Sequence, residues 1–146
     1  MVLWRISRHL DLSGKGGMRA NARWHRAGIP VVYLSESPSS ALLEVCVHTA
    51  SNRVPEDFTL LRVEGPDVNV STVPEGYLSE DWAKQSALTQ ELGTDWLSGN
   101  TGVLLRVPSA IVPYTSNYLF NPVHPLAGDF RIVQVTAWPF DGRIKQ

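Results

Sequence analysis

Short apolar or alternating segments recur along the chain and are separated by polar, proline-rich and glycine-rich stretches. Segments of this length and composition are typical of β-strands, whereas amphipathic helices need longer runs. We therefore predict strands over five segments: Val2–Ile6, Pro30–Ser35, Phe58–Val63, Val103–Val107 and Phe130–Ala137. A further short edge strand is predicted at 68–70, in a connection that is rich in proline, valine and aspartate.

Two longer segments carry helical signals. Ser37-Pro38 offers an N-cap followed by the proline that suits the first helical position, and this helix is expected to continue to about Thr49. Glu80–Leu97 is predicted to be helical in two pieces with Gly93 as the break, and its apolar stripe is expected to lie in the core. Strands on both sides of two helical segments predict a single α+β domain, residues 1–146, with mixed, mostly antiparallel sheets and flanking helices.

Two irregular segments are rich in residues that can carry chemistry. Ser7–Gly28 is long for a loop of a compact domain, and loops longer than about 12–15 residues tend to be functional or disordered. Ile111–Tyr118 is predicted to be irregular, and the asparagines and prolines that follow it favour turns. Loops held by a rigid scaffold commonly carry functional side chains, so both segments are candidates.

Composition narrows the class of protein. The chain has 146 residues, of which 43% are apolar and 18% charged, as expected of one folded domain. Its net charge of −1 disfavours general nucleic-acid binding, although the first 26 residues are locally basic. The only cysteine, Cys46, cannot form an intrachain disulfide and is expected to be a buried, inert thiol. Without a membrane-length apolar run or a signal-peptide core, we expect a soluble cytoplasmic protein.

The patterns of several common catalytic sites are missing from the sequence. Four scattered histidines and one cysteine do not form a zinc motif. There is no G-x-S-x-G elbow, and no dinucleotide-binding glycine motif follows a predicted strand. The glycine-rich stretch around Lys15 lacks the Lys-Ser/Thr pair of a Walker loop. We therefore predict neither a metal nor a resident cofactor.

The remaining candidates are an arginine, an aromatic residue, a carboxylate and a serine: Arg23, Tyr33, Glu44 and Ser109. Polar residues in reserve are Asn117, Asn121 and His124. An arginine pairs bidentately with a pyrophosphate, an aromatic ring offers a stacking face, and a carboxylate suits a ribose hydroxyl or an oxocarbenium-like centre. Ser40, Glu44 and His48 share one stripe of the first helix, which is either solvated or lines a pocket. These residues fit a dinucleotide site, and an α+β domain without this chemistry stays open as the alternative.

These residues and their surroundings resemble the RES domain, a toxin family named after an arginine, a glutamate and a serine. The matching residues are Arg23 in A-R-W-H, Glu44 in A-L-L-E-V and Ser109 in V-P-S-A-I. The fragments W-R-I, P-V-V-Y-L-S-E-S-P, V-P-S-A-I-V-P, N-Y-L-F-N-P-V-H-P and D-G-R follow the family order across nearly the whole chain. The sequence departs from the family beside the Arg-Trp pair, where the preceding glycines are replaced and His25 stands in place of an asparagine.

The resemblance implies an ADP-ribosyltransferase-like fold and an enzyme that depletes NAD+ by breaking the nicotinamide–ribose bond, which arrests growth. NAD+ is then a substrate rather than a cofactor, and the acceptor is water or inorganic phosphate as co-substrate. The catalytic residues that the resemblance implies are Arg23, Glu44 and Ser109. Those implied in substrate binding are Tyr33, Arg5, His48, Asn117 and Asn121.

The resemblance also implies a partner. RES toxins pair with an Xre antitoxin, whose helix-turn-helix domain binds DNA and which blocks the toxin site. We therefore expect a hetero-oligomer that contacts DNA only through the antitoxin. We expect no contact with a membrane. Three other functions are kept as alternatives: an ADP-ribosyltransferase that modifies a cellular protein, a ribonuclease-type toxin, and a catalytically silent module that only binds its partner.

Overall fold

The computed structural model describes residues 1–145 and contains one seven-stranded sheet. The strands are β1 (Val2–Ile6), β2 (Val32–Ser35), β3 (Asp57–Glu64), β4 (Ser71–Thr72), β5 (Leu104–Pro108), β6 (Ser116–Phe120) and β7 (Arg131–Pro139). Their order across the sheet is β4-β5-β6-β2-β1-β3-β7. All neighbouring strands pair antiparallel except β4 and β5, which are parallel. The predicted α+β class with mostly antiparallel pairing is confirmed.

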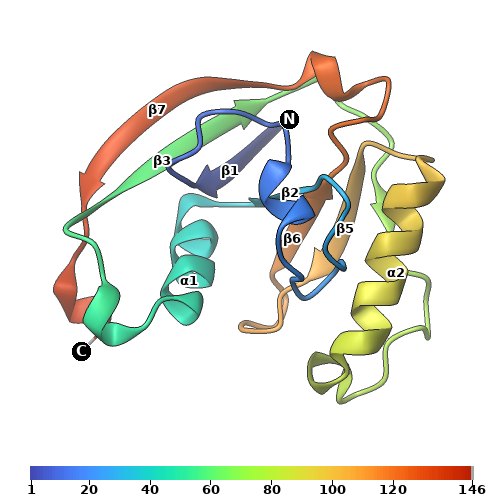
Figure 1. The fold of residues 1–146 in the computed structure, drawn as a ribbon, viewed down its shortest axis with the longest axis horizontal. Coiled ribbons are helices and arrows are strands. Elements are labelled where there is room, and N and C mark those ends of the chain that lie inside the picture. The colour runs from blue at the N-terminus through green and yellow to red at the C-terminus, as the bar shows by residue number, and fades with distance from the viewer. Residues whose placement is uncertain (146) are drawn as a thin grey trace.

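The sheet bends at its centre, where β1 meets β2. These two strands share the registered pair Trp4 and Ser35, whereas β1 and β3 pair over five positions from Val2–Glu64 to Ile6–Leu60. Figure 1 shows the consequence, because β1, β3 and β7 form one wing and β2, β6 and β5 form a second wing that runs in another direction. The first helix lies beside this bend.

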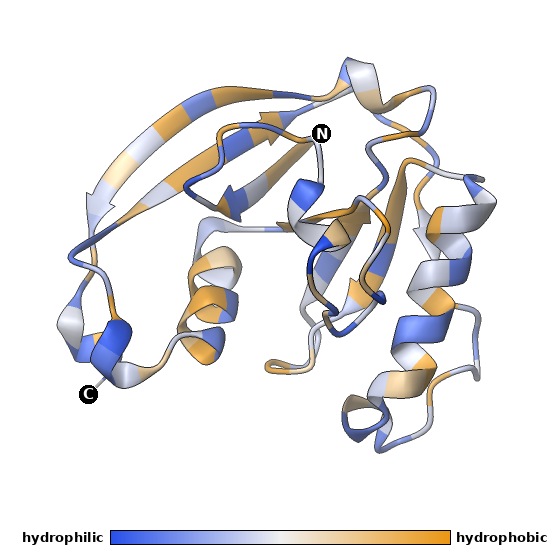
Figure 2. Ribbon diagram, viewed as in Figure 1, coloured by the Kyte–Doolittle hydropathy of each residue, from blue (hydrophilic) through white to orange (hydrophobic). Residues whose placement is uncertain are grey.

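Helix α1 (Pro38–His48) begins as the sequence predicts. The Ser37 side chain accepts a hydrogen bond from the Ser40 backbone N–H at 3.1 Å, and Pro38 occupies the first turn, where its missing N–H costs nothing. The helix packs against β1 and β2, at the bend of the sheet. Figure 2 shows it as strongly hydrophobic, in keeping with its position between the wings.

Two hydrophobic clusters occupy opposite faces of the central strands. The first comprises Leu3, Val32, Leu34, Val63, Val103, Leu104, Phe120 and Phe130. The second comprises Trp24, Val31, Leu97, Leu105, Val107 and Leu119, with helix α2 (Ser86–Gly99) packed over it. Successive residues of a strand point to opposite faces, which is why β2 places Leu34 in the first cluster and Tyr33 against the second. Cys46 is buried, as predicted.

Three predicted elements are wrong. The short strand lies at Ser71–Thr72 rather than at 68–70, where Val68 and Val70 pack on the first cluster instead of pairing. The second helical region does break in two, but between the 3-10 turn Trp82–Lys84 and α2, whereas Gly93 lies inside α2. The end of the segment predicted to be irregular forms β6, whose pairing with both β2 and β5 overrides its polar composition.

No helix within residues 1–145 is both long and apolar enough to cross a membrane.

Candidate active site

A cavity of about 550 Å³ lies between α1, the end of the first long loop, the strands β1 and β2, and the connection between β5 and β6. Its volume falls in the range of roughly 300–1,000 Å³ that is typical of small-molecule sites. The structure brings six of the eight predicted site residues to its wall: Arg5, Arg23, Tyr33, Glu44, His48 and Asn117. Residues that are up to 112 positions apart in the sequence therefore meet at one place.

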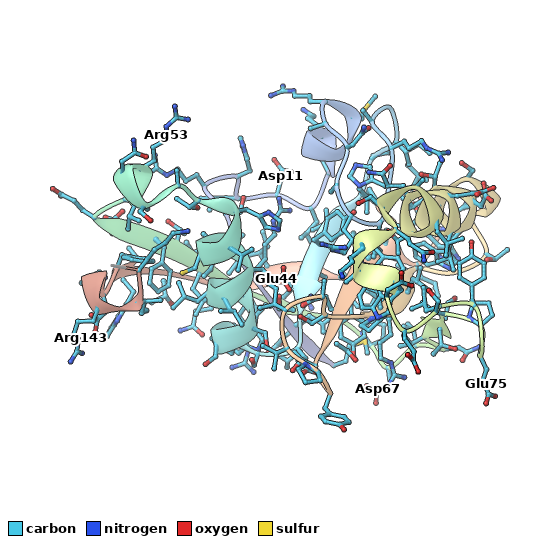
Figure 3. All side chains as sticks on the ribbon, turned by 90° about the horizontal axis from the view of Figure 1, so that it is seen from below. Asp11, Glu44, Arg53, Asp67, Glu75 and Arg143 are labelled. Carbon is cyan, nitrogen blue, oxygen red and sulfur yellow. The ribbon has the colours of Figure 1, made fainter. Side chains whose placement is uncertain are left out.

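Glu44 projects from the middle of α1 toward this cavity. Figure 3 shows it near the centre of the view, whereas Arg53, Arg143 and Glu75 lie toward the periphery, and its side chain is 30% exposed. Asn117 Nδ2 donates a hydrogen bond to Glu44 Oε1 at 2.7 Å, and Ser109 Oγ lies 3.4 Å from the same oxygen. The other oxygen, Oε2, lies 4.0 Å from Nε2 of His48, which is one helical turn further on and mostly exposed. The carboxylate is thus oriented through one oxygen while the second remains available to a ligand.

The two cavity arginines differ in their protein contacts. Arg23 Nη1 donates a hydrogen bond to the carbonyl of Ala83 at 2.7 Å, and its guanidinium lies 6.0 Å from the ring centroid of Trp82. Within residues 1–145, the Arg5 guanidinium forms neither a hydrogen bond nor an ion pair. Burial lowers the pKa of Arg5, an effect that Asp11 partly offsets, but an arginine stays charged at neutral pH. The cavity therefore holds a partly buried cation whose donors have no hydrogen-bond partner among residues 1–145.

Tyr33 is held by its hydroxyl group. Its oxygen lies 2.7 Å from Nδ1 of His25 and accepts a hydrogen bond from the Trp24 backbone N–H at 3.3 Å. Nε2 of His25 lies 3.0 Å from the carbonyl oxygen of Gly17. Burial raises the pKa of the Tyr33 phenol, so the hydroxyl stays protonated, and burial also lowers the pKa of His25. Because the hydroxyl group is bonded within the protein, the aromatic ring is the part of Tyr33 that can contact a ligand.

Helix α2 fixes the backbone of the loop that carries Arg23. Thr89 Oγ1 donates to the carbonyl of Arg23 at 2.5 Å, Gln90 Nε2 donates to the carbonyl of Ala22 at 2.9 Å, and the Arg26 N–H donates to Thr94 Oγ1 at 3.0 Å. Thr89 is fully buried. Sequence reasoning missed this role, because hydrogen-bonding residues on a helix face carry no signal of the loop that they contact.

Two predicted site residues lie outside the wall of the cavity. Ser109 contacts Glu44 as described, and its Oγ also accepts hydrogen bonds from two backbone N–H groups, at 3.1 Å and 3.3 Å, so it orients the carboxylate. Asn121 is buried elsewhere: its Nδ2 donates to Asn100 Oδ1 at 2.9 Å, and its Oδ1 accepts from the Val123 N–H at 3.3 Å. Both polar atoms of its amide have partners within the protein, and the structure places Asn121 away from the cavity wall.

The buried imidazole of His25 predicts a pH dependence of stability. In the unfolded chain His25 takes up a proton near pH 6.5, whereas the lowered pKa keeps the folded form neutral to lower pH. The unfolded state therefore binds more protons between these two pKa values, and the free energy of unfolding falls as the pH is lowered below about 6.5. Urea unfolding at pH 7.5, 6.5 and 5.5 measures this slope. We expect His25→Asn to flatten it, and an unchanged slope would contradict the burial of an uncharged imidazole.

Comparisons with known proteins show which family the chain belongs to. A family model described as the RES domain matches residues 2–142. "Toxin Res" of Pseudomonas putida KT2440 is 49% identical over 99% of both chains, and "Toxin Res" of Photorhabdus laumondii is 37% identical over 89% of this chain and 85% of that protein. "Prs ADP-ribosylating toxin" of Sphingobium sp. YBL2 is 33% identical over 97% of this chain and 94% of that protein.

A solved structure shares the fold. The crystal structure of the M. tuberculosis MbcT–MbcA toxin–antitoxin complex contains a chain that superposes with a TM-score of 0.71 over 99% of this chain and 86% of that chain. Sequence identity is 17%, so this likeness concerns the fold alone. The family match and the curated relatives each cover nearly the whole length, and the chain belongs to the RES domain family.

Proposed function

We propose that the protein is the toxin of a toxin–antitoxin pair and that it depletes NAD+ by cleaving the nicotinamide–ribose bond. The toxin assignment is supported by the relatives that carry the name "Toxin Res". One observation carries the chemistry: a single carboxylate, Glu44, is oriented through one oxygen at the wall of a cavity that also holds Arg5, Arg23 and the ring of Tyr33. A dinucleotide offers a matching set of groups, namely a ribose, a pyrophosphate and a planar base.

The reaction needs little acid catalysis. In NAD+ the nicotinamide ring is cationic, so it departs as a neutral molecule when it takes the electron pair of the C–N bond. The positive charge then moves to the ribose, which becomes oxocarbenium-like. In this proposal Oε2 of Glu44 binds a ribose hydroxyl, and the negative charge of the oriented carboxylate stabilises the developing positive charge. An oxygen of phosphate or water then bonds to the ribose carbon, and the products are ADP-ribose 1-phosphate or ADP-ribose with loss of a proton.

The other cavity residues have separate roles in this proposal. Arg5 supplies the main contact to the pyrophosphate or to an attacking phosphate, because its guanidinium has no competing partner within residues 1–145. Arg23 adds a second cation, with one of its donors already used by Ala83. Tyr33 stacks on the nicotinamide side. Ser109 and Asn117 hold Glu44, and no bound metal or resident cofactor takes part.

The first test is NAD+ consumption by purified protein with and without inorganic phosphate, with the products identified by mass. Cleavage that accelerates with phosphate and gives ADP-ribose 1-phosphate identifies a phosphorylase. Loss that is independent of phosphate and gives ADP-ribose identifies a glycohydrolase. If folded protein free of antitoxin leaves NAD+ intact, NAD+ depletion is the wrong function.

Arg5→Gln tests the anion site. We expect a fall in kcat/KM for NAD+ on the order of ten- to a hundredfold, because a charge-assisted hydrogen bond contributes about 1.5–3 kcal/mol. Steady-state kinetics at fixed phosphate measure the effect. Arg8→Gln is the matched control, since Arg8 lies nearby in the sequence and is exposed. Equal kinetics for the two variants would remove Arg5 from the site.

A second candidate function is ADP-ribosyl transfer to a cellular protein. It is favoured by the relative from Sphingobium, which is named "Prs ADP-ribosylating toxin" and matches over almost the whole chain. The same carboxylate and arginines serve both reactions, because they differ only in the nucleophile that attacks the ribose. Incubation of a lysate with NAD+ labelled in its adenylate part separates them. Label on a macromolecule supports transfer, whereas label only in small products supports cleavage.

We further propose that the partner is an antitoxin of the Xre type. MbcT, which shares this fold, was crystallised as a toxin–antitoxin complex. Blocking the cavity is the simplest way for such a partner to inhibit a toxin whose site is one open pocket. Co-expression with the neighbouring reading frame, followed by purification of the complex and measurement of NAD+ loss, tests both the pairing and the inhibition.

A further inference from the structure

His25 is a buried polar residue that none of the proposed chemical steps uses. Its side chain is 2% exposed and links two segments that border the site. Nε2 lies 3.0 Å from the carbonyl oxygen of Gly17, in the glycine-rich loop, and Nδ1 lies 2.7 Å from the hydroxyl oxygen of Tyr33, on β2. His25 also pairs through its backbone with Ala22, next to Arg23. His25 therefore connects the loop and the strand through its imidazole, and the arginine segment through its backbone.

The contact with Gly17 determines which nitrogen carries the proton. A carbonyl oxygen only accepts hydrogen bonds, so Nε2 must carry the proton and donate it. In the neutral ring Nδ1 is then an acceptor, and Tyr33 donates its hydroxyl proton to it. The phenol oxygen accepts from the Trp24 N–H in turn. The Tyr33 hydroxyl thus makes both of its contacts within the protein, which leaves its ring as the part that meets a substrate.

We propose that His25, in its neutral Nε2–H form, is a positioning residue that fixes the ring of Tyr33 at the wall of the cavity. This inference rests on the proposed NAD+ chemistry of that cavity. Without the bond to Nδ1, the Tyr33 hydroxyl keeps only the hydrogen bond from the Trp24 N–H at 3.3 Å, whereas the two bonds together hold the ring in one orientation. Small displacements of a positioning group lower activity strongly, because the substrate is no longer held in a reactive geometry.

Three substitutions at His25 and one at Tyr33 separate the two bonds of the imidazole. In His25→Asn the amide oxygen occupies roughly the place of Nδ1 and can accept from Tyr33, but the side chain is too short to reach Gly17. In His25→Gln the longer side chain reaches Gly17 with its amide N–H but offers no acceptor at the Nδ1 place. His25→Ala removes both bonds. Tyr33→Phe keeps the ring and removes only the hydroxyl.

The experiment measures KM and kcat for NAD+, together with Tm, for these variants. We expect His25→Gln, His25→Ala and Tyr33→Phe to raise KM by roughly tenfold or more. His25→Asn should keep KM within about twofold of the wild type, even where its Tm falls as far as that of His25→Gln. A His25→Gln/Tyr33→Phe double variant should lose no more than either single variant, because both break the same bond. Equal KM values for the Asn and Gln variants, or additive losses in the double variant, would overturn the proposal.

Nitrogen NMR of the wild-type imidazole tests the same network without any substrate. A protonated Nε2 with an unprotonated Nδ1 at neutral pH supports it, and the opposite tautomer overturns it. If wild-type protein turns over no NAD+, the proposed function fails, and the nitrogen shifts still decide for or against the bond to Tyr33. Failure of the function and failure of the positioning network are therefore distinguishable.

Discussion

Glu44→Gln is expected to remove most NAD+ cleavage while leaving the fold intact. Glutamine keeps an acceptor oxygen for the Asn117 amide, which lies 2.7 Å from Oε1, so the local packing is retained. What is lost is the negative charge beside the developing oxocarbenium ion. Preorganised groups that stabilise transition-state charge contribute on the order of 10²–10³ in kcat, and we expect a loss in that range. NAD+ consumption by the purified variant measures it.

The matched control for this substitution is Glu36→Gln. Glu36 is exposed and lies just before the start of α1. The Glu36→Gln substitution therefore removes one negative charge from the same region without changing a residue of the cavity wall. We expect wild-type turnover for this control and an unchanged Tm for both variants. Near-wild-type turnover by folded Glu44→Gln would exclude Glu44 as the stabilising carboxylate. In cells, the same variant should no longer arrest growth when it is expressed without an antitoxin.

Gly93→Ala is expected to destabilise the protein although alanine is the better helix former. A Cβ atom at Gly93 would lie 1.7 Å from the carbonyl oxygen of Trp24, a backbone atom that cannot rotate away. Alanine gains about 1 kcal/mol in helix propensity, whereas overpacking costs about 1–3 kcal/mol and more when the backbone must move. We expect a net loss of about 2 kcal/mol or more, which lowers Tm by about 5 °C or more.

This substitution should also impair the site. The clash lies between the three side-chain contacts that α2 makes with the loop around Arg23, so separating the helix from the loop weakens all of them. We expect KM for NAD+ to rise in whatever folded protein remains. Gly99→Ala in the same helix is the control, since its Cβ would lie 4.0 Å from the nearest side-chain atom, in ordinary contact distance. Equal melting temperatures for the two variants would contradict the close packing of α2 on the loop.

Local sequence signals determined much of the fold. The first strand and the start of α1 agree with prediction because each depends on neighbouring residues, namely an apolar run at Val2–Ile6 and a serine cap before a proline at Ser37. The helix start then places Glu44 two turns in. Residue chemistry and the family motifs together supplied the site candidates, and six of the eight line one cavity.

Only the tertiary structure decided how these candidates are used. Pairing of β6 between β2 and β5 brings Asn117 to Glu44 across 73 positions, and no local pattern encodes that contact. No local pattern encodes the role of Gly93 either. As a helix-breaking residue it predicted a helix boundary, but it lies inside α2, where the Trp24 carbonyl leaves no space for a side chain. Asn121 was a polar candidate by sequence and belongs to a buried turn. Local patterns therefore identified most of the elements and the chemically suitable residues. Long-range pairing and close packing determined β6, the continuity of α2 through Gly93, and which candidates face the cavity.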